Sequence, residues 1–276
     1  MTDFGQWLAQ NHTPKYASEL LRYVRKYYHV LEFPERAAEI SVLSMDTRRL
    51  VMSGLANLSK YLGCYEHWKA IVKNSGLKWE KKVSLDIVLD IMNTDLGDTW
   101  VWLKEVVQKV PREYGTVLVF AALSGLRPTE AVNSTRLISE LSESGRLDTY
   151  LNKDMMMLEH FRFKDLFLRR CKNAFISFIT PELLELVLKY KPDVRYAALD
   201  TIINRLRLPN KTKYLRKYYA TVLREYLPTE AIDLLQGRIN QSVFLRYYYK
   251  PFLQDIKAKA LRGIEPLQSE LLTLFP

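Results

Sequence analysis

The sequence is poor in the residues from which metal and redox sites are built. Its 2 cysteines, Cys64 and Cys171, lie far apart at no metal-binding or redox spacing, and its 4 histidines are scattered along the chain. Zinc sites require clustered ligands, so no metal is expected. A glycine-rich phosphate loop is also missing from the sequence. We therefore expect a protein that works without a metal, a cofactor or a small-molecule substrate.

Long hydrophobic runs are missing as well. No stretch approaches the roughly 20 apolar residues of a membrane-spanning helix, so no membrane partner is expected. Asp3, Gln6 and Gln10 break up the first residues, which therefore do not resemble a secretory signal. Two cysteines without a pairing pattern fit a reduced compartment. These absences favour a cytoplasmic location.

Positive charge is what the chain has in excess. It carries 41 Lys and Arg against 31 Asp and Glu, a net charge of +10 over 276 residues. A hydrophobic content of 48% is enough for a packed core in one large or two modest domains. The charge favours an anionic partner, with nucleic acid ahead of a membrane.

The hydrophobic periodicity predicts a mainly α protein with a small β-sheet or hairpin (α+β). Helical spacing is clear over 17–28, 47–62 and 65–74. These helices form a predicted N-terminal domain over residues 1–76, followed by a linker at 77–84 and a second domain at 85–276. In the first domain, basic side chains follow one helix: Lys15, Arg22, Arg25 and Lys26.

Two features of the second domain bear on function. A helix is predicted to stop at Gly125, and Pro128 suits the first turn of the next one, so Arg127 lies at a helix–helix turn. The stretch 161–180 alternates apolar residues on both sides of a polar segment, which predicts a β-hairpin with Lys172 at or near its tip.

The most basic stretch is Arg205–Arg224, with seven Lys or Arg and no acid. Within it, Lys213 and Arg216 are three residues apart and share a helix face. The segment Lys213–Leu223 reads Lys-Tyr-Leu-Arg-Lys-Tyr-Tyr-Ala-Thr-Val-Leu. It resembles the His-x-Leu-Arg-His-x-x-Ala-Thr-x-Leu box of tyrosine recombinases, with Lys213 in the first His position and Lys217 in the second.

Other segments continue this resemblance in the family's order. Ala122–Val132, Ala-Leu-Ser-Gly-Leu-Arg-Pro-Thr-Glu-Ala-Val, resembles the Thr-Gly-Leu-Arg-x-Ser-Glu box, with Arg127 as the clamp arginine and Glu130 bracing it. Lys172 falls where the family carries a hairpin lysine. Leu234–Arg238 resembles the Leu-Gly-His stretch, with Arg238 in the place of His or Trp.

The departures from the family pattern are informative. Lys213 in place of His and Arg238 in place of His or Trp resemble the integrases of archaeal spindle-shaped viruses and related plasmids. A protonated Lys donates rather than accepts, which leaves open whether Lys213 acts as a base or only as a phosphate ligand. The matching segments cover most of residues 85–250.

The resemblance implies a metal- and ATP-independent DNA strand transferase. Its N-terminal core-binding domain and its catalytic domain would form a clamp on double-stranded DNA, working as a dimer or tetramer on attachment sites in host chromosomal DNA. A tyrosine would attack the phosphate and leave a 3′-phosphotyrosine, with Arg127, Lys172, Lys213, Arg216 and Arg238 as catalytic partners. The expected outcome is integration or excision of a viral or plasmid element.

Two sets of residues complete the expected site. Tyr247, Tyr248 and Tyr249 follow the third box, and each is a candidate nucleophile. Phe244, Tyr247 and Phe252 form a predicted core stripe at helical spacing, which favours Tyr248 as the tyrosine that faces DNA. The residues expected to bind DNA are Arg22, Arg25, Lys26, Lys211 and Lys217.

Two alternative functions stay open at this point. A type IB topoisomerase relaxes DNA through the same covalent step, although the compact length and the wording of the second box favour a recombinase. A catalytically inactive DNA-binding protein could keep the same fold, and the replacement of His by Lys at position 213 is its best support.

Overall fold

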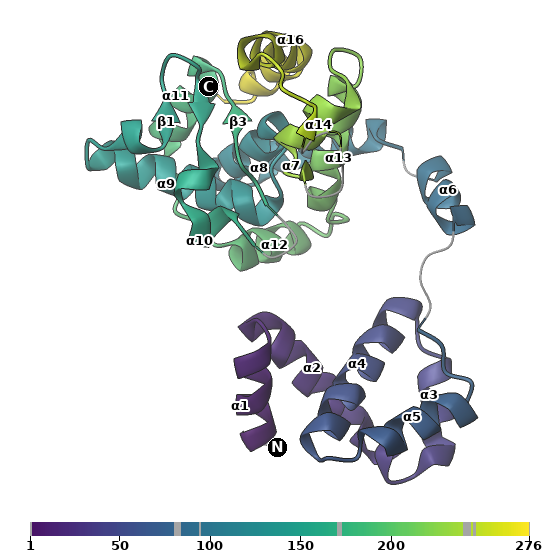
Figure 1. The fold of residues 1–276 in the computed structure, drawn as a ribbon. Coiled ribbons are helices and arrows are strands. Elements are labelled where there is room, and N and C mark those ends of the chain that lie inside the picture. The colour runs from purple at the N-terminus through teal and green to yellow at the C-terminus, as the bar shows by residue number, and fades with distance from the viewer. Residues whose placement is uncertain are drawn as a thin grey trace. The chain divides into compact units, whose positions relative to one another are not determined.

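A computed structural model describes residues 2–79, 84–93, 95–169, 173–239, 244 and 247–275. The chain divides into two compact units, Met1–Asn93 and Thr94–Pro276. Helices dominate both, and the described residues include one small antiparallel sheet (Figure 1). The predicted class, mainly α with a small sheet, is confirmed. The predicted domain boundary at residue 84 and this division differ by one helix, α6.

The first unit consists of short helices. They are α1 Thr2–Asn11, α2 Pro14–Tyr27, η1 Tyr28–Leu31, η2 Pro34–Ala37, α3 Ala38–Ser41, α4 Met45–Tyr61, α5 Tyr65–Asn74 and α6 Ser84–Met92. Helices α2 and α4 cross at Gly54, where an added Cβ would lie 2.9 Å from Cγ2 of Val24. A glycine there lets the two backbones approach closely, and the predicted helices over 17–28 and 65–74 are confirmed.

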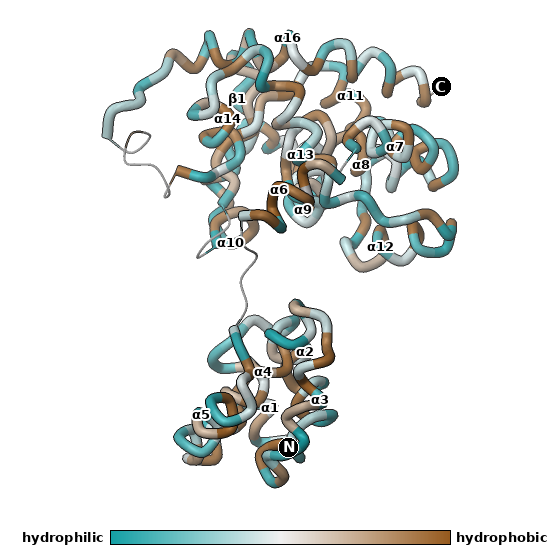
Figure 2. Tube along the Cα trace, turned by 90° about the vertical axis from the view of Figure 1, so that its right-hand side faces the viewer, coloured by the Kyte–Doolittle hydropathy of each residue, from teal (hydrophilic) through white to brown (hydrophobic). Residues whose placement is uncertain are grey.

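Helix α6 differs from the others because its apolar side chains are exposed. They are Leu85, Ile87, Val88, Leu89, Ile91 and Met92. Figure 2 shows this helix as a predominantly hydrophobic segment. Nothing else in the described structure covers these side chains, so α6 contributes no core residue.

The second unit is built around one buried helix. Its helices are α7 Gly97–Lys109, α8 Arg112–Ser124, α9 Pro128–Glu143, η3 Leu147–Thr149, η4 His160–Arg162, α10 Lys164–Phe167, α11 Pro181–Tyr190, α12 Tyr196–Arg205, α13 Thr212–Leu223, α14 Thr229–Leu235 and α16 Leu253–Leu272. Every residue of α8 from Gly115 to Ser124 is buried. It packs against α7, α9, α11, α13 and α16, as a helix that is apolar on all faces must.

The sheet lies earlier in the chain than predicted. Strands β1 Leu151–Asn152, β2 Met157–Leu158 and β3 Ser177–Phe178 pair antiparallel in that order, with Leu151 opposite Leu158 and Met157 opposite Phe178. The last strand falls inside the predicted hairpin, whereas the first two were missed. Two-residue strands are too short to show an alternating pattern.

The predicted first strand of the hairpin, over Phe161–Leu168, is wrong. That segment forms η4 and α10. Phe163 and Phe167 are four residues apart, and both rings meet the ring of Tyr150, at centroid distances of 5.3 and 6.0 Å. Helical spacing, rather than strand alternation, puts both rings on one side. Lys172, the expected tip residue, lies outside the described residues.

A buried chain of hydrogen bonds joins the sheet to α9. Ser134 Oγ lies 2.8 Å from the Tyr150 hydroxyl, which lies 2.7 Å from Nδ1 of His160, and Nε2 of His160 lies 2.9 Å from Ser177 Oγ. All four side chains are buried. Burial lowers the pKa of His160 to about 3, so the imidazole is neutral in the folded protein at neutral pH.

This burial predicts a pH-dependent stability. Between pH 6.5 and about 3 the unfolded chain binds a proton at His160 that the folded chain does not. The free energy of unfolding should therefore fall as the pH falls, by about 1.4 kcal/mol per pH unit from this group. His160→Gln should reduce that slope in urea unfolding of the second unit, whereas His67→Gln, at an exposed position in the first unit, should not. An unchanged slope in His160→Gln would contradict this assignment.

Candidate functional site

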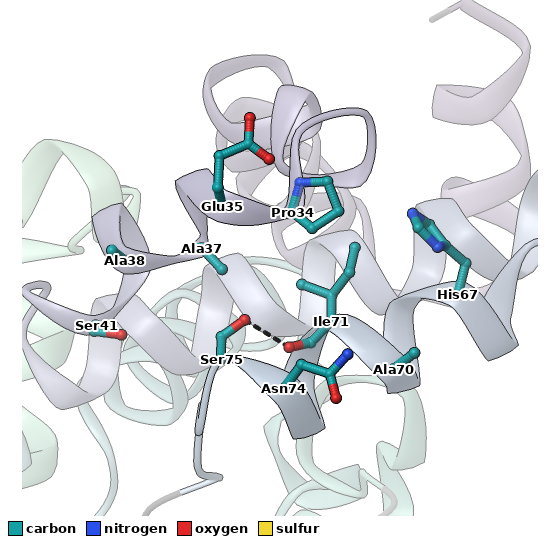
Figure 3. Close-up of a pocket in the computed structure, with 10 residues that line it drawn as sticks. All are labelled: Pro34, Glu35, Ala37, Ala38, Ser41, His67, Ala70, Ile71, Asn74 and Ser75. Carbon is teal, nitrogen blue, oxygen red and sulfur yellow. Dashed lines mark hydrogen bonds between the residues drawn. The ribbon is translucent and has the colours of Figure 1, made fainter.

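A pocket in the first unit does not suit a phosphate. It lies between η2, α3 and α5 (Figure 3) and is lined by Pro34, Glu35, Ala37, Ala38, Ser41, His67, Ala70, Ile71, Asn74 and Ser75. Half of these side chains are apolar, and Glu35 adds a negative charge. His67 is engaged through Nε2 with the Leu31 carbonyl, at 2.9 Å. No lysine or arginine lines this pocket, so it offers no cation to an anionic ligand.

The first box forms a tight corner between two buried helices. Helix α8 ends at Gly125, which has a φ of 67°. The Tyr219 ring packs directly on this glycine, because an added Cβ would lie 2.3 Å from Cδ1 of Tyr219. Any other residue at 125 would meet both the strained φ and this ring. The corner therefore brings the end of α8 against α13, which carries the second box.

Arg127 is the N-cap residue of α9, and Glu130 folds back onto it. The Arg127 backbone N–H donates to Oε2 of Glu130 at 2.9 Å, and Arg127 Nη1 donates to Oε1 at 2.7 Å. A glutamate three residues inside the helix is the usual partner in a capping box. The carboxylate of Glu130 is thereby held, fully buried, at the start of α9.

Three arginines from three separate segments meet this one carboxylate. Arg169 Nη2 lies 3.4 Å from Oε1 of Glu130, and Arg216 Nη1 lies 3.8 Å from Oε2, in addition to the Arg127 contact. Each guanidinium stays charged at neutral pH. One carboxylate neutralises one of them, so the cluster keeps a surplus of positive charge. We call these four residues the arginine cluster.

Arg216 lies deepest of the three arginines. Its Nη1 donates to the Gly125 carbonyl at 3.1 Å and its Nη2 donates to the Gln236 carbonyl, while Gln236 Nε2 donates back to the Arg216 carbonyl at 3.1 Å. Burial, followed by the positive charge of Arg127, lowers the pKa of Arg216 to about 10. It remains protonated at pH 7 and is held by backbone carbonyls of the first and third boxes.

Arg238 approaches the cluster through a second close backbone contact. Gly237 has a φ of 65°, and an added Cβ would lie 2.0 Å from the Asn173 carbonyl oxygen. The positive charge of Arg238 is one of the influences that lower the pKa of Arg216. Arg238 Nη1 also lies 3.6 Å from Oδ1 of Asp233. The structure thus brings both Arg127 and Arg238 within electrostatic reach of Arg216.

The structure places the predicted lysines Lys211, Lys213 and Lys217 beside partners other than Glu130. Lys213 and Lys217 are exposed on α13, and their ammonium groups lie 4.9 and 5.1 Å from the centre of the Tyr214 ring. Lys211 lies 3.6 Å from Oδ2 of Asp98. Lys213 therefore shares the helix of Arg216 but lies over Tyr214 rather than beside Glu130, and Lys172 is outside the described residues.

The predicted core stripe around the tyrosines is wrong. Phe244, Tyr247 and Phe252 are exposed, by 50%, 63% and 86%, and so is Tyr248, by 73%. Tyr249 is the tyrosine that packs on the core. The backbone N–H groups of Tyr248 and Tyr249 both donate to the Phe244 carbonyl at 2.9 Å, so the turn closes there and a regular helical face does not continue to Phe252.

The packing changes the ranking of the candidate nucleophiles. Burial, together with Glu230 and Asp255, raises the pKa of Tyr249, which opposes formation of a phenolate there. Tyr248 stacks on Phe244 with ring centroids 6.4 Å apart and is otherwise well exposed. Exposure keeps both Tyr247 and Tyr248 as candidates, whereas packing disfavours Tyr249.

Sequence reasoning did not single out Arg169 or Asn173. The Asn173 carbonyl accepts from Arg127 Nη1 at 3.3 Å, and its side-chain Oδ1 accepts from the Arg169 backbone N–H at 2.8 Å. Both residues belong to the polar segment Arg-Arg-Cys-Lys-Asn at 169–173. That polarity was the available signal, but only the tertiary contacts show that these two positions lie at the arginine cluster.

Helix α2 in the first unit presents the predicted basic residues to solvent. Arg22, Arg25 and Lys26 are exposed, while the opposite face of the helix buries Leu20 and Val24. The three cations line a shallow depression together with Ser18 and Leu21. The predicted basic face therefore exists, and the rings of Tyr23 and Tyr27 support two of its cations, Arg22 at 4.8 Å and Lys26 at 5.2 Å.

The described residues contain neither a metal-binding cluster nor a membrane-spanning helix. No group of three or more His, Cys, Asp or Glu side chains lies close enough together there to hold a metal ion. In the same part of the chain, no helix has both the length and the apolar character needed to cross a membrane.

Comparisons with known proteins leave the family open. No family model matches the chain, and no solved structure matches it. An alignment 139 residues long, which covers 46% of this chain, shows 26% identity to the ATP phosphoribosyltransferase regulatory subunit of Clostridium kluyveri and covers 36% of that protein. This similarity is low and spans little more than a third of the relative, so it does not show a family for this chain.

The contact between Gly237 and Asn173 predicts a matched pair of substitutions. Gly145 and Gly237 both have a φ of 65°, but nothing lies within 4 Å of an added Cβ at Gly145. Gly145→Ala should cost about 1 kcal/mol through backbone strain alone. Gly237→Ala should lower the free energy of unfolding by about 1–3 kcal/mol more than Gly145→Ala does, because the Asn173 backbone must also move. Urea unfolding measures both, and equal losses would contradict the close approach.

Proposed function

We propose that this protein cleaves and rejoins DNA strands through a covalent tyrosine intermediate, as a site-specific recombinase or integrase. The observation that carries the proposal is the convergence of Arg127, Arg169 and Arg216 on the buried Glu130. These arginines come from segments about 40 to 90 residues apart, so the cluster is a product of the fold rather than of local sequence. Its surplus positive charge suits a phosphodiester.

The chemistry of a phosphodiester fits this donor set. Arginine donates two parallel charge-assisted hydrogen bonds, which match the two non-bridging oxygens of a phosphate. In the proposed step the tyrosine Oη forms a bond to phosphorus and the bond from phosphorus to the 5′-oxygen breaks. The phenol proton leaves, and the departing 5′-oxygen takes up a proton. Rejoining reverses the same step with the 5′-hydroxyl of the partner strand.

The charge that develops on the non-bridging oxygens is where the arginines act. Donors that are already in place stabilise a transition state most, because they need no reorganisation as the reaction proceeds. Arg216 meets this requirement, since backbone carbonyls of Gly125 and Gln236 hold its guanidinium. Arg127 meets it through Glu130 and Asn173. To contact the phosphate, the Lys213 ammonium would have to move away from the Tyr214 ring. Lys172 would be a further cationic donor to the phosphate.

The first unit would hold the duplex through its backbone. Arg22, Arg25 and Lys26 lie exposed on α2, and phosphate contacts of this kind position a protein without reading sequence. Lys211 and Lys217 would add similar contacts from α13 in the second unit. We propose that the two units together clamp double-stranded DNA, with a dimer or tetramer assembling on the attachment sites.

A covalent adduct tests the proposal. The substrate is a duplex that the protein selects from a random-sequence pool, nicked at successive positions so that a short 5′-hydroxyl fragment escapes after cleavage. The wild type should form an adduct that survives SDS, and peptide mapping should place the link within Tyr247–Tyr249. Tyr248→Phe should bind this DNA but form no adduct, because Phe keeps the ring and removes the hydroxyl.

The three single Tyr→Phe variants separate the possible outcomes. If only Tyr247→Phe loses the adduct, the proposed mechanism stands and Tyr247, rather than Tyr248, is the nucleophile. Adduct formation by all three variants would overturn the mechanism. EDTA should leave the wild-type rate unchanged. DNA binding without any adduct in the wild type would instead favour an inactive DNA-binding protein, and relaxation of supercoiled plasmid without strand exchange would favour a topoisomerase.

The salt dependence of binding tests the role of α2. Each phosphate contact that is lost should reduce the slope of log K against log salt by about 0.9. Arg25→Gln combined with Lys26→Gln should therefore reduce the slope by about 2. Lys73→Gln, at an exposed position on α5, removes one positive charge outside this face and should leave the slope unchanged. Equal slopes for the wild type and the double variant would place the duplex elsewhere.

A further inference from the structure

We propose that Arg169 is a third arginine that contacts the phosphate under attack, and so a catalytic residue that the resemblance to known recombinases does not assign. This inference rests on the proposed function. It starts from a shared contact, because Arg127 Nη1 and Arg169 Nη2 both lie against the same oxygen of Glu130, at 2.7 and 3.4 Å. Two guanidinium groups are thus held side by side on one buried carboxylate.

The charge balance of this arrangement calls for an anion. Glu130 is fully buried and compensates one positive charge, while Arg127, Arg169 and Arg216 bring three. Neighbouring like charges repel, and the pKa of Arg216 falls partly for this reason. A phosphodiester that entered beside the cluster would neutralise a second charge and relieve the repulsion.

The remaining hydrogen-bond donors identify Arg169 as the arginine most available to a ligand. Arg216 already donates to two backbone carbonyls, and Nη1 of Arg127 donates to both Glu130 and Asn173. Among the described residues, the Arg169 side chain makes one long contact, to Glu130 at 3.4 Å. Its side chain is also the most exposed of the three, at 44% against 25% for Arg127 and 10% for Arg216. It therefore has both the free N–H groups and the access that a DNA phosphate needs.

The backbone of Arg169 is held in place from both sides. Its N–H donates to Oδ1 of Asn173 at 2.8 Å, and the Leu168 N–H donates to the Lys164 carbonyl at 2.7 Å. The Ala174 N–H donates to the Phe167 carbonyl at 3.1 Å, which ties the two ends of the segment together. Asn173 itself lies against Gly237, so Arg169 is fixed relative to the third box as well as to Glu130.

In the reaction, Arg169 would act on charge and take no part in bond formation. As the tyrosine Oη bonds to phosphorus and the 5′-oxygen departs, negative charge sits on the non-bridging oxygens. Arg169 would donate a hydrogen bond to one of these oxygens. Together with Arg127 and Arg216 it would stabilise the negative charge on them. Asn173 is a positioning residue in this scheme, because it orients Arg169 and Arg127 without touching the phosphate.

The test compares charged and neutral phosphates in the adduct assay. Arg169→Gln should slow adduct formation on the ordinary nicked duplex by about 10²- to 10³-fold, the usual loss for one such donor. Replacing one non-bridging oxygen of the scissile phosphate by a methyl group removes the negative charge that Arg169 would stabilise. On that methylphosphonate duplex, the variant should come within about tenfold of the wild type, since an electrostatic donor has little left to stabilise.

Two further variants keep the test decisive. Arg162→Gln removes an arginine of the same region that pairs with Glu159, away from the cluster, and should match the wild type on both duplexes. Arg169→Lys keeps a positive charge beside Glu130 and loses the two-pronged donor, so it should stay folded and still slow cleavage of the ordinary duplex more than tenfold. This variant decides the question if Arg169→Gln does not fold.

The outcomes distinguish this inference from the proposed function. An adduct formed at the wild-type rate by both Arg169 variants would overturn the role of Arg169 and leave the recombinase proposal intact. An equal loss on the charged and the neutral duplex would also overturn it, because it would show a structural role. If the wild type forms no adduct at all, the proposed function fails, and the role of Arg169 fails with it.

Discussion

The buried carboxylate of Glu130 is the group around which the second unit is arranged. A charged side chain with no exposed surface is costly unless opposite charges and hydrogen bonds accompany it. Here the Arg127 backbone N–H and three guanidinium groups supply that compensation. Without the carboxylate, three cations would lie close together and repel one another. Without the cations, the buried carboxylate would have no opposite charge beside it. Stability and the candidate chemistry therefore depend on the same contacts.

Close backbone packing makes this arrangement possible. Gly125 lets the Tyr219 ring lie on the end of α8, and Gly237 lets the Asn173 carbonyl lie against the third box. Neither glycine leaves room for a Cβ. The first contact holds α13, which carries Arg216, and the second holds the segment that carries Arg169. The buried helix α8 gives these segments a common support, since it packs on both α9 and α13. Arg127 and Arg216 are thus positioned by packed helices, as donors that must be in place before a reaction would need to be.

The sequence carried enough information to predict several of the helices and part of the candidate site. Helical periodicity and the glycine at 125 defined α8, α9 and their corner, and the three-residue spacing of Arg127 and Glu130 indicated that they pair. The resemblance of the second and third boxes to those of tyrosine recombinases implied that Arg216 and Arg238 belong with them. The pairing of Arg127 with Glu130 could be predicted because contacts between near neighbours in a helix follow from local geometry. The hairpin prediction was wrong because aromatic residues such as Phe163 and Phe167 fit both an alternating pattern and a helical turn.

What the sequence alone determined is therefore the class of fold, the basic character of α2 and α13, and the pairing of Arg127 with Glu130. Only the tertiary structure decided that Arg169 and Asn173 join the site, that Lys213 lies over Tyr214, and that Tyr249 rather than Tyr247 packs inward. Each of these outcomes depends on contacts between segments far apart in the chain. A local pattern records the preference of a residue for a helix or a surface, but it does not record which distant side chain will lie across from it.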